Sequence, residues 1–201
     1  MPPDRRDASL RPATLKAAVR AVGAALSDLP VPGMLIGGIA VIARGVPRLT
    51  RDVDVTVAGG VLDLPGIVER LRAHDLVPRI EDAVAFASVN QVLLLRHEPS
   101  GVDIDVSIAW LPFEREALAA SELLEIAGGR IPVARAEDLI VYKAIAFRPQ
   151  DQQDIERLLA LHGARIDLQR VRRTVAEFAQ AIEEPERIGD VERLVERAGL
   201  A

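Results

Sequence analysis

Residues 48–57 read RLTRDVDVTV, and the pattern within them sets the type of fold. From Asp52 onward, polar and apolar residues alternate, which is the period of a β-strand. Residues i and i+2 of a strand point to the same face, so Asp52 and Asp54 share one face and the valines between them point to the other. With a rise of about 3.3 Å per residue, the two carboxylates emerge about 7 Å apart. Carboxylates spaced in this way can bind one hard cation or bracket a pair of them.

A later stretch repeats this pattern. Residues 102–108 read VDIDVSI, so Asp103 and Asp105 also share one strand face. Two strands that both present aspartates on one face repel each other unless a cation lies between them, because like charges oppose ionisation. The alternative is a polar strand face that meets only water, and the recurrence of the pattern weakens it. The sequence therefore predicts a divalent metal site.

A glycine pair stands between a strand and a helix. Gly37 and Gly38 follow the apolar run 34–36, and helical spacing resumes over 39–43. Glycines at such a turn let backbone amides approach a phosphate group. A tight turn without a ligand is the alternative. Neither the P-loop pattern nor the dinucleotide pattern GxGxxG is present, so those two nucleotide sites are not expected.

The remaining periodicity divides the chain into two regions. Residues 1–134 predict a mixed sheet flanked by helices, an α/β (α+β) core, and residues 135–201 predict a small helical region packed on it. Further elements are expected as helices at 10–29, 64–74, 136–147, 149–161, 168–182 and 188–198, as strands at 84–88 and 91–95, and as a hairpin over 123–133 that turns at Gly128-Gly129.

The composition narrows the classes of protein. Of the 201 residues, 49% are hydrophobic, so a full core can be buried. The absence of cysteine excludes disulfides and thiolate metal sites and fits the cytoplasm. No apolar run approaches the roughly 18 residues of a membrane span, and the first residues do not resemble a signal peptide. The net charge of −5 argues against nonspecific binding of nucleic acid over the whole surface.

Three segments together resemble a known signature. They are Gly37-Gly-Ile-Ala40, Arg48-x-Thr50-x-Asp52-Val-Asp54 and Gly101-Val-Asp-Ile-Asp105. They resemble the polymerase-β-like nucleotidyltransferase superfamily and, more narrowly, its minimal AbiEii-type members, the toxin halves of bacterial toxin–antitoxin and phage-defence pairs. The resemblance implies a nucleotidyltransferase-type fold in which Asp52, Asp54 and Asp105 are catalytic and bind Mg²⁺, with Mn²⁺ as an alternative. Asp103 competes with Asp105 for the third position.

The resemblance also implies a nucleotide site. Gly37, Gly38, Arg48 and Thr50 would contact the triphosphate, and Gly38 stands where many members carry a serine. The likeness continues through residues 136–155, where Lys143 would face the phosphates and Asp151 and Asp154 would orient it. Asp151 has a structural alternative, because Pro149 can begin a helix and an anion is favoured in its first turn.

The implied reaction is Mg²⁺-dependent transfer of a nucleoside monophosphate from an NTP such as ATP to an acceptor hydroxyl. The acceptor would be a tRNA end or a protein, and the enzyme would be the toxin partner of an antitoxin protein. Two alternatives stay open. One is a catalytically silent interaction module on the same fold, and the other is a small-molecule nucleotidyltransferase of the aminoglycoside type.

Overall fold

A computed structural model describes residues 12–60 and 63–200 of the chain. The chain divides into two compact units. The first unit comprises Met1–Ile39 and Leu49–Ala134, and the second comprises Ala40–Arg48 and Arg135–Ala201.

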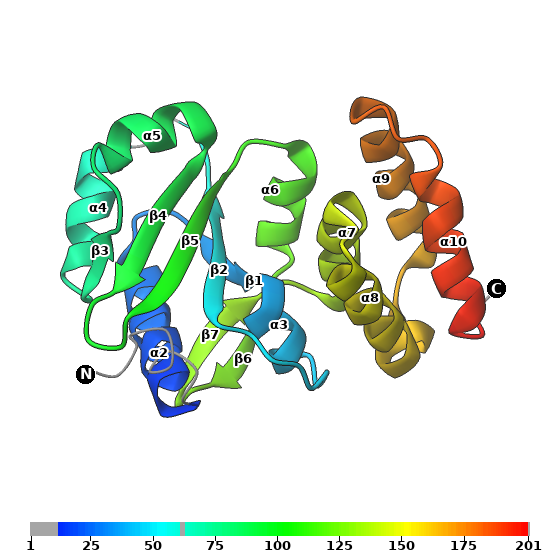
Figure 1. The fold of residues 1–201 in the computed structure, drawn as a ribbon, viewed down its shortest axis with the longest axis horizontal. Coiled ribbons are helices and arrows are strands. Elements are labelled where there is room, and N and C mark those ends of the chain that lie inside the picture. The colour runs from blue at the N-terminus through cyan, green and yellow to red at the C-terminus, as the bar shows by residue number, and fades with distance from the viewer. Residues whose placement is uncertain (1–11, 61–62, 201) are drawn as a thin grey trace, which may run out of the picture. The chain divides into compact units, whose positions relative to one another are not determined.

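The first unit is built on a seven-stranded mixed sheet (Figure 1). The strands are β1 (Gly33–Ile36), β2 (Asp52–Ala58), β3 (Leu76–Pro78), β4 (Val92–His97), β5 (Val102–Ala109), β6 (Glu122–Ile126) and β7 (Gly129–Val133). Their order across the sheet is β3-β4-β5-β2-β1-β7-β6. The pairs β2–β5 and β1–β7 are parallel, and the other neighbours are antiparallel. This arrangement confirms the mixed α/β core and the hairpin of β6 and β7.

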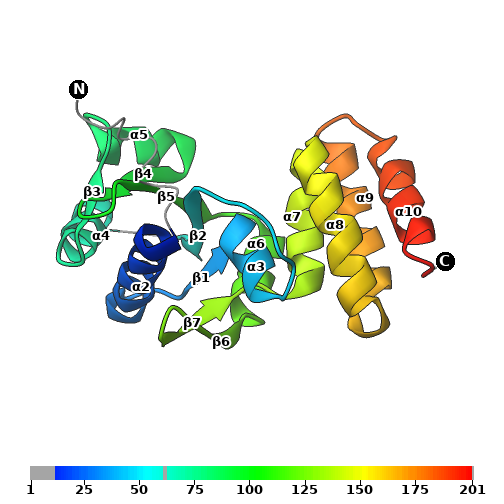
Figure 2. The ribbon, with the colours of Figure 1, turned by 60° about the horizontal axis from the view of Figure 1, so that its bottom comes forward.

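One face of this sheet is apolar and covered by helices. The helices α2 (Pro12–Asp28) and α4 (Leu64–Arg72) lie on the same side of the sheet in Figure 2. Val55 and Ile104, from β2 and β5, are buried there with Leu26 of α2 and Leu71 of α4. Because successive strand residues alternate between faces, the aspartates of β2 and β5 lie on the opposite side. The start expected for α2, at residues 10–11, lies outside the described residues.

Two helices of this unit differ from the sequence prediction. Residues 84–88, expected as a strand, lie within helix α5 (Ala83–Asn90). A short apolar run does not distinguish a strand from a helix, and here the alanines favour the helix. The helix ends where Gln91 adopts a left-handed conformation. Helix α6 (Pro112–Ala119) was not anticipated, and the Glu114 carboxylate accepts hydrogen bonds from two backbone N–H groups at its start.

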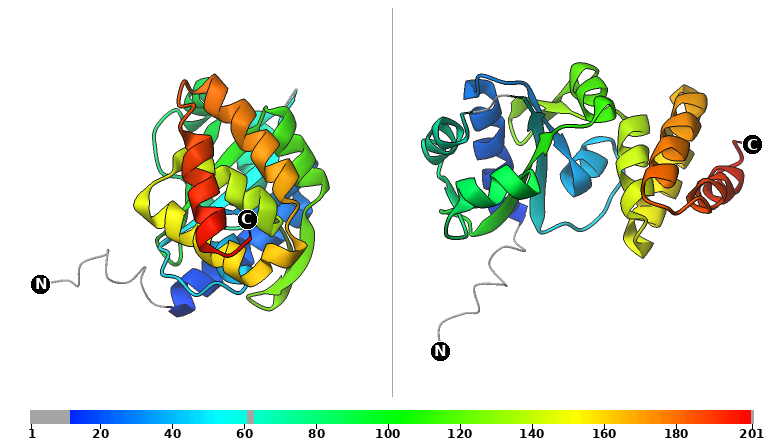
Figure 3. Two further views of the ribbon diagram at one scale, coloured as in Figure 1. Left: turned by 90° about the vertical axis from the view of Figure 1, so that its right-hand side faces the viewer. Right: turned by 90° about the horizontal axis from the view of Figure 1, so that it is seen from above.

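The second unit is helical, as predicted. It contains α7 (Ala136–Ala146), α8 (Pro149–His162), the 3₁₀ turn η1 (Gly163–Arg165), α9 (Leu168–Ala181) and α10 (Arg187–Arg197). The last two helices run side by side in Figures 1 and 3. Arg172 of α9 donates two hydrogen bonds, of 2.7 and 2.9 Å, to the Glu192 carboxylate of α10. Helix α3 (Gly37–Ala43) starts directly after β1, and its last four residues belong to this unit.

None of the helices described for residues 12–60 and 63–200 is both long and apolar enough to cross a membrane.

Candidate active site

Four carboxylates lie on one face of the central strand pair. Strands β2 and β5 are parallel neighbours in a register that places Asp52 opposite Asp103 and Asp54 opposite Asp105. Neighbouring strands are about 4.8 Å apart, so the carboxylates of an opposed pair are within reach of one ion. The two sequence patterns therefore meet on the same face, as a shared metal site requires.

Asp105 has a carboxyl group whose pKa is raised above its ordinary value. Burial raises the pKa of its carboxyl group, and the nearby charges of Asp52 and Asp103 raise it further. Arg79 lowers the pKa and offsets only part of this effect. A carboxylate that is desolvated and surrounded by like charges is stabilised in its charged form by an added cation.

Two arginines reach the carboxylates of β5, Arg79 from just after the edge strand β3 and Arg96 from β4. Arg79 Nη2 lies 2.9 Å from Asp105 Oδ1, and Arg79 Nη1 lies 3.6 Å from Asp103 Oδ2. Arg96 Nε donates a hydrogen bond of 2.7 Å to Asp103 Oδ1. Although Asp105 Oδ1 is buried and close to Arg79, it accepts no hydrogen bond. Sequence reasoning missed Arg79, because it follows β3 and no motif surrounds it.

The donor set fits a hard cation. Asp54 and Asp105 offer carboxylate oxygens from adjacent strands, and Mg²⁺ is usually bound by one or two carboxylates together with water and substrate phosphates. Among the described residues, no three His, Asp or Glu side chains lie close enough together to hold an ion by themselves. The arrangement therefore suits a metal whose remaining ligands come from the nucleotide.

Thr50 supports the first aspartate of this set. Its hydroxyl donates a hydrogen bond of 2.8 Å to Asp52 Oδ1 from the loop that leads into β2. Thr50, expected at the triphosphate, is thus placed to orient the Asp52 carboxylate.

The glycine turn lies against Asp54. Gly37 directly follows Ile36, which is opposite Asp54 in the β1–β2 register, and it has a left-handed φ of +60°. A β-carbon at position 37 would overlap the Asp54 carboxylate. Only glycine therefore combines this turn with a carboxylate packed directly on the backbone. Gly38 is the next residue and is buried in the first turn of α3.

Replacing Gly37 by alanine is expected to displace the Asp54 carboxylate and to abolish most of the nucleotidyl transfer that the sequence resemblance implies. The left-handed backbone adds a cost of about 1–2 kcal/mol to the fold. Transfer assays and thermal unfolding measure the two effects. Gly128→Ala is the matched control, since it also has a positive φ of 88° and lies in the β6–β7 turn. If Gly37→Ala kept full activity, the close packing of Gly37 on Asp54 would have no functional importance.

Arg48 and Lys143 meet in a buried ionic cluster of the second unit. Lys143 Nζ lies 2.7 Å from Asp154 Oδ2 and 3.1 Å from Asp151 Oδ1, and Arg48 Nη1 lies 2.5 Å from the same oxygen of Asp154. Asp154 is 1% exposed and Lys143 is 6% exposed. Asp151 also accepts a hydrogen bond from the backbone N–H of Arg148 at the start of α8. Both cations therefore have carboxylate partners, which a triphosphate would have to displace or share.

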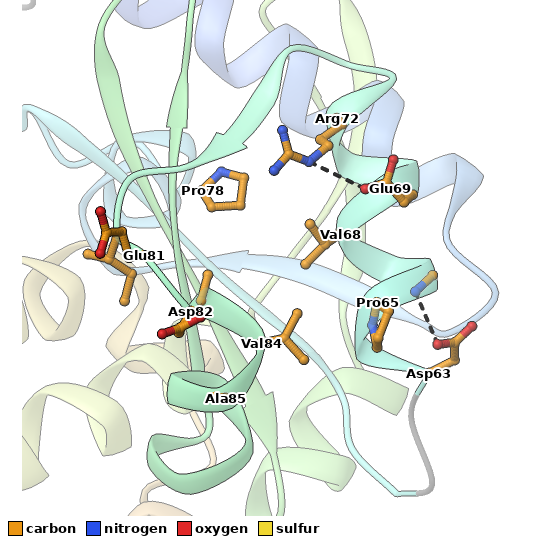
Figure 4. Close-up of a pocket in the computed structure, with 13 residues that line it drawn as sticks. Asp63, Pro65, Val68, Glu69, Arg72, Pro78, Glu81, Asp82, Val84 and Ala85 are labelled. Carbon is orange, nitrogen blue, oxygen red and sulfur yellow. Dashed lines mark hydrogen bonds and ion pairs between the residues drawn. The ribbon is translucent and has the colours of Figure 1, made fainter.

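The first unit also contains an open cavity of about 870 Å³ between α4 and the segment that joins β3 to α5 (Figure 4). Val68, Pro78 and Val84 supply apolar surface, and Arg72 lies 3.5 Å from Glu69 at its margin. None of the four strand aspartates lines this cavity. Its residues at 78 and 80 directly flank Arg79 in the sequence.

Solved structures with a similar fold include an antibiotic-resistance factor and a nucleotidyltransferase-like protein. The solution structure of the antibiotic-resistance factor ANT(2″)-Ia has a TM-score of 0.61 and 17% identity, over 88% of this chain and 97% of that chain. ANT(2″)-Ia in complex with adenylyl-2″-tobramycin gives a TM-score of 0.54 and 17% identity, over 84% and 99% of the two chains. An antigenic nucleotidyltransferase-like protein from Paracoccidioides brasiliensis gives 0.53 and 15%, over 90% and 94%. At sequence identities this low, the structural similarity shows a shared fold alone.

No curated protein matches the chain. The family model described as "Nucleotidyl transferase of unknown function (DUF2204)" matches residues 85–194, a range that includes β5 and begins after β2. Because this match covers more than half of the chain, the protein belongs to the DUF2204 family of nucleotidyl transferases and is a nucleotidyltransferase that uses an NTP.

Proposed function

We propose that the protein uses Mg²⁺, or Mn²⁺ in its place, to transfer a nucleoside monophosphate from an NTP such as ATP to an acceptor hydroxyl. The observation that carries the proposal is the register of β2 and β5, which pairs Asp54 with Asp105 on one sheet face beside Gly37. Asp52, Asp54 and Asp105 are the proposed metal ligands, together with phosphate oxygens of the NTP, because no three such side chains of the described residues hold an ion by themselves. Asp105 is preferred to Asp103 because it lies directly opposite Asp54 and because Asp103 is engaged by two arginines.

The reaction follows from this placement. The acceptor oxygen forms a bond to the α-phosphorus, the bond to the oxygen that bridges the α- and β-phosphates breaks, and pyrophosphate leaves. Catalysis of this kind depends on positioning and charge neutralisation, which a bound divalent ion supplies. Thr50 holds Asp52 in place, and Gly37 lets Asp54 pack against the turn. Asp105, whose pKa is raised by burial, would either complete the metal site or accept the proton of the acceptor hydroxyl.

The proposed acceptor is a tRNA end or a protein hydroxyl, and the proposed role is that of a toxin controlled by an antitoxin protein. The support is the sequence resemblance to the AbiEii-type branch, through the glycine pair and the Arg48-x-Thr50-x-Asp52-Val-Asp54 motif.

A cationic small molecule is the second candidate acceptor. The cavity of about 870 Å³ has the size of a small-molecule site, and four carboxylates line it, those of Asp63, Glu69, Glu81 and Asp82. The fold is similar to that of ANT(2″)-Ia, which is named as an antibiotic-resistance factor and was solved with adenylyl-2″-tobramycin. An aminoglycoside is therefore the small molecule to test.

A labelled transfer assay tests the proposal and separates these acceptors. The protein is incubated with each α-³²P-labelled NTP and Mg²⁺, together with total tRNA, total protein or an aminoglycoside. Label is expected on one acceptor class, and none is expected after chelation of the metal. If no NTP labels any of the three classes, titration calorimetry with NTP and Mg²⁺ decides the case. Absence of binding would establish a silent module and refute the proposed reaction.

A further inference from the structure

Arg79 occupies the cation position beside Asp105. We propose that it is a positioning residue that competes with the divalent ion for Asp105, so that the ion binds together with the NTP and only weakly alone. This inference rests on the proposed function, because it concerns the same carboxylates.

Arg79 is held against β4 by its backbone and by its guanidinium. Its backbone N–H donates a hydrogen bond of 3.0 Å to Leu94 O, which ties the residue to β4. Its Nη1 donates a hydrogen bond of 3.4 Å to Leu95 O, on the same strand. Because β4 lies between β3 and β5, the guanidinium reaches across β4 to the carboxylates of β5. The positive charge of Arg79 therefore lies next to the carboxylates on the acidic face of the sheet.

Arg96 provides the contrast within the same sheet. It lies opposite Asp103 in the β4–β5 register and pairs with that carboxylate at 2.7 Å. Its side chain is 49% exposed, whereas that of Arg79 is 21% exposed. Exposed ion pairs contribute little to stability or affinity, and screening by water is weaker for the pair of Arg79 and Asp105.

Competition follows from the position of the charge. A divalent ion that binds Asp105 must displace the guanidinium or lie close to it, and repulsion between the two cations lowers the affinity for the ion. An NTP changes this balance because its phosphate oxygens add ligands and negative charge. A displaced guanidinium can then pair with phosphate through two parallel hydrogen bonds. The arginine would thus favour loading of the site by the complete metal–nucleotide complex.

Binding of Mn²⁺, followed by electron paramagnetic resonance of the free ion, tests the competition without any turnover. The Arg79→Gln variant is expected to bind Mn²⁺ alone about fivefold more tightly than the unaltered protein, because an ion pair worth about 1 kcal/mol corresponds to about fivefold in affinity. Arg79→Lys keeps the positive charge and is expected to stay close to the unaltered protein. Arg96→Gln is the matched control and is expected to change the affinity less than twofold. Adding a non-hydrolysable NTP analogue should raise the affinity more for the unaltered protein than for Arg79→Gln.

The outcomes separate this inference from the proposed function. If Arg79→Gln binds Mn²⁺ with unchanged or lower affinity while the analogue promotes binding in all proteins, the inference is overturned and the metal site stands. If no variant binds Mn²⁺ even with the analogue, the proposed metal-dependent reaction fails, and the inference fails with it. Thermal unfolding of each variant checks that the comparison is made between folded proteins.

Discussion

Replacing Asp54 by asparagine is expected to slow nucleotidyl transfer by about three orders of magnitude. Asp54 lies at the centre of the acidic face, opposite Asp105 on β5 and against Gly37 in the turn after β1. An amide of the same shape keeps this packing but removes the charge that a divalent ion needs. Loss of metal-assisted charge stabilisation is worth several kcal/mol, and about 4 kcal/mol corresponds to a thousandfold in rate. The rate is measured with a labelled NTP and saturating Mg²⁺.

The fold should survive this change. The variant removes one of four acidic groups on a single face, so mutual repulsion among the remaining carboxylates decreases. Its melting temperature is expected within a few degrees of that of the unaltered protein. Glu125→Gln, at an exposed position of β6, makes the same change of charge and should leave the rate unchanged. Full activity of the Asp54→Asn protein would remove the metal site from the mechanism.

The local pattern around the aspartates predicted this part of the fold well. The strands predicted from alternation in residues 52–57 and 102–108 are confirmed by β2 and β5, because period-two burial is a property of each strand alone. Thr56 departs from the alternation, since it is buried although it lies on the face of Asp52 and Asp54. The glycine pair was expected between a strand and a helix, and β1 and α3 lie there. The pairing of Asp54 with Asp105 needed one further step, since alternation predicts a shared face within each strand but not the register between strands.

Features that depend on distant residues were not predictable in this way. Arg79 meets Asp105 only because β3 and β5 are both neighbours of β4, and sequence spacing carries no such information. The prediction of a strand at 84–88 is wrong because a short apolar run fits either kind of element, and the left-handed Gln91 that ends helix α5 has no clear sequence signal. The contact of Arg48 with Asp154 joins residues 106 positions apart and has no sequence signal, while the role of Arg48 at the triphosphate stays a prediction.

Replacing Asp154 by asparagine is expected to destabilise the second unit by about 3–5 kcal/mol. Asp154 is 1% exposed and is the shared partner of Lys143 and Arg48, at 2.7 and 2.5 Å. Removing one member of a buried ionic cluster leaves the opposite charges uncompensated in a poorly solvated site. The free-energy cost of this exceeds the net stabilisation that the ion pair itself provides. Lys143 keeps Asp151 as a partner at 3.1 Å, so the loss should fall at the lower end of that range. In a chain of this length, 3 kcal/mol lowers the melting temperature by about 6–12 °C.

Denaturant and thermal unfolding of the Asp154→Asn protein measure this effect. Glu69→Gln is the matched control, because Glu69 also faces an arginine, at 3.5 Å, but is 75% exposed. That change is expected to alter the free energy of unfolding by less than about 1 kcal/mol, since water already screens the exposed pair. If the two variants were equally stable, the cluster of Arg48, Lys143 and Asp154 would contribute no more than a surface pair. The sequence-based assignment of Lys143 to the nucleotide would then gain support.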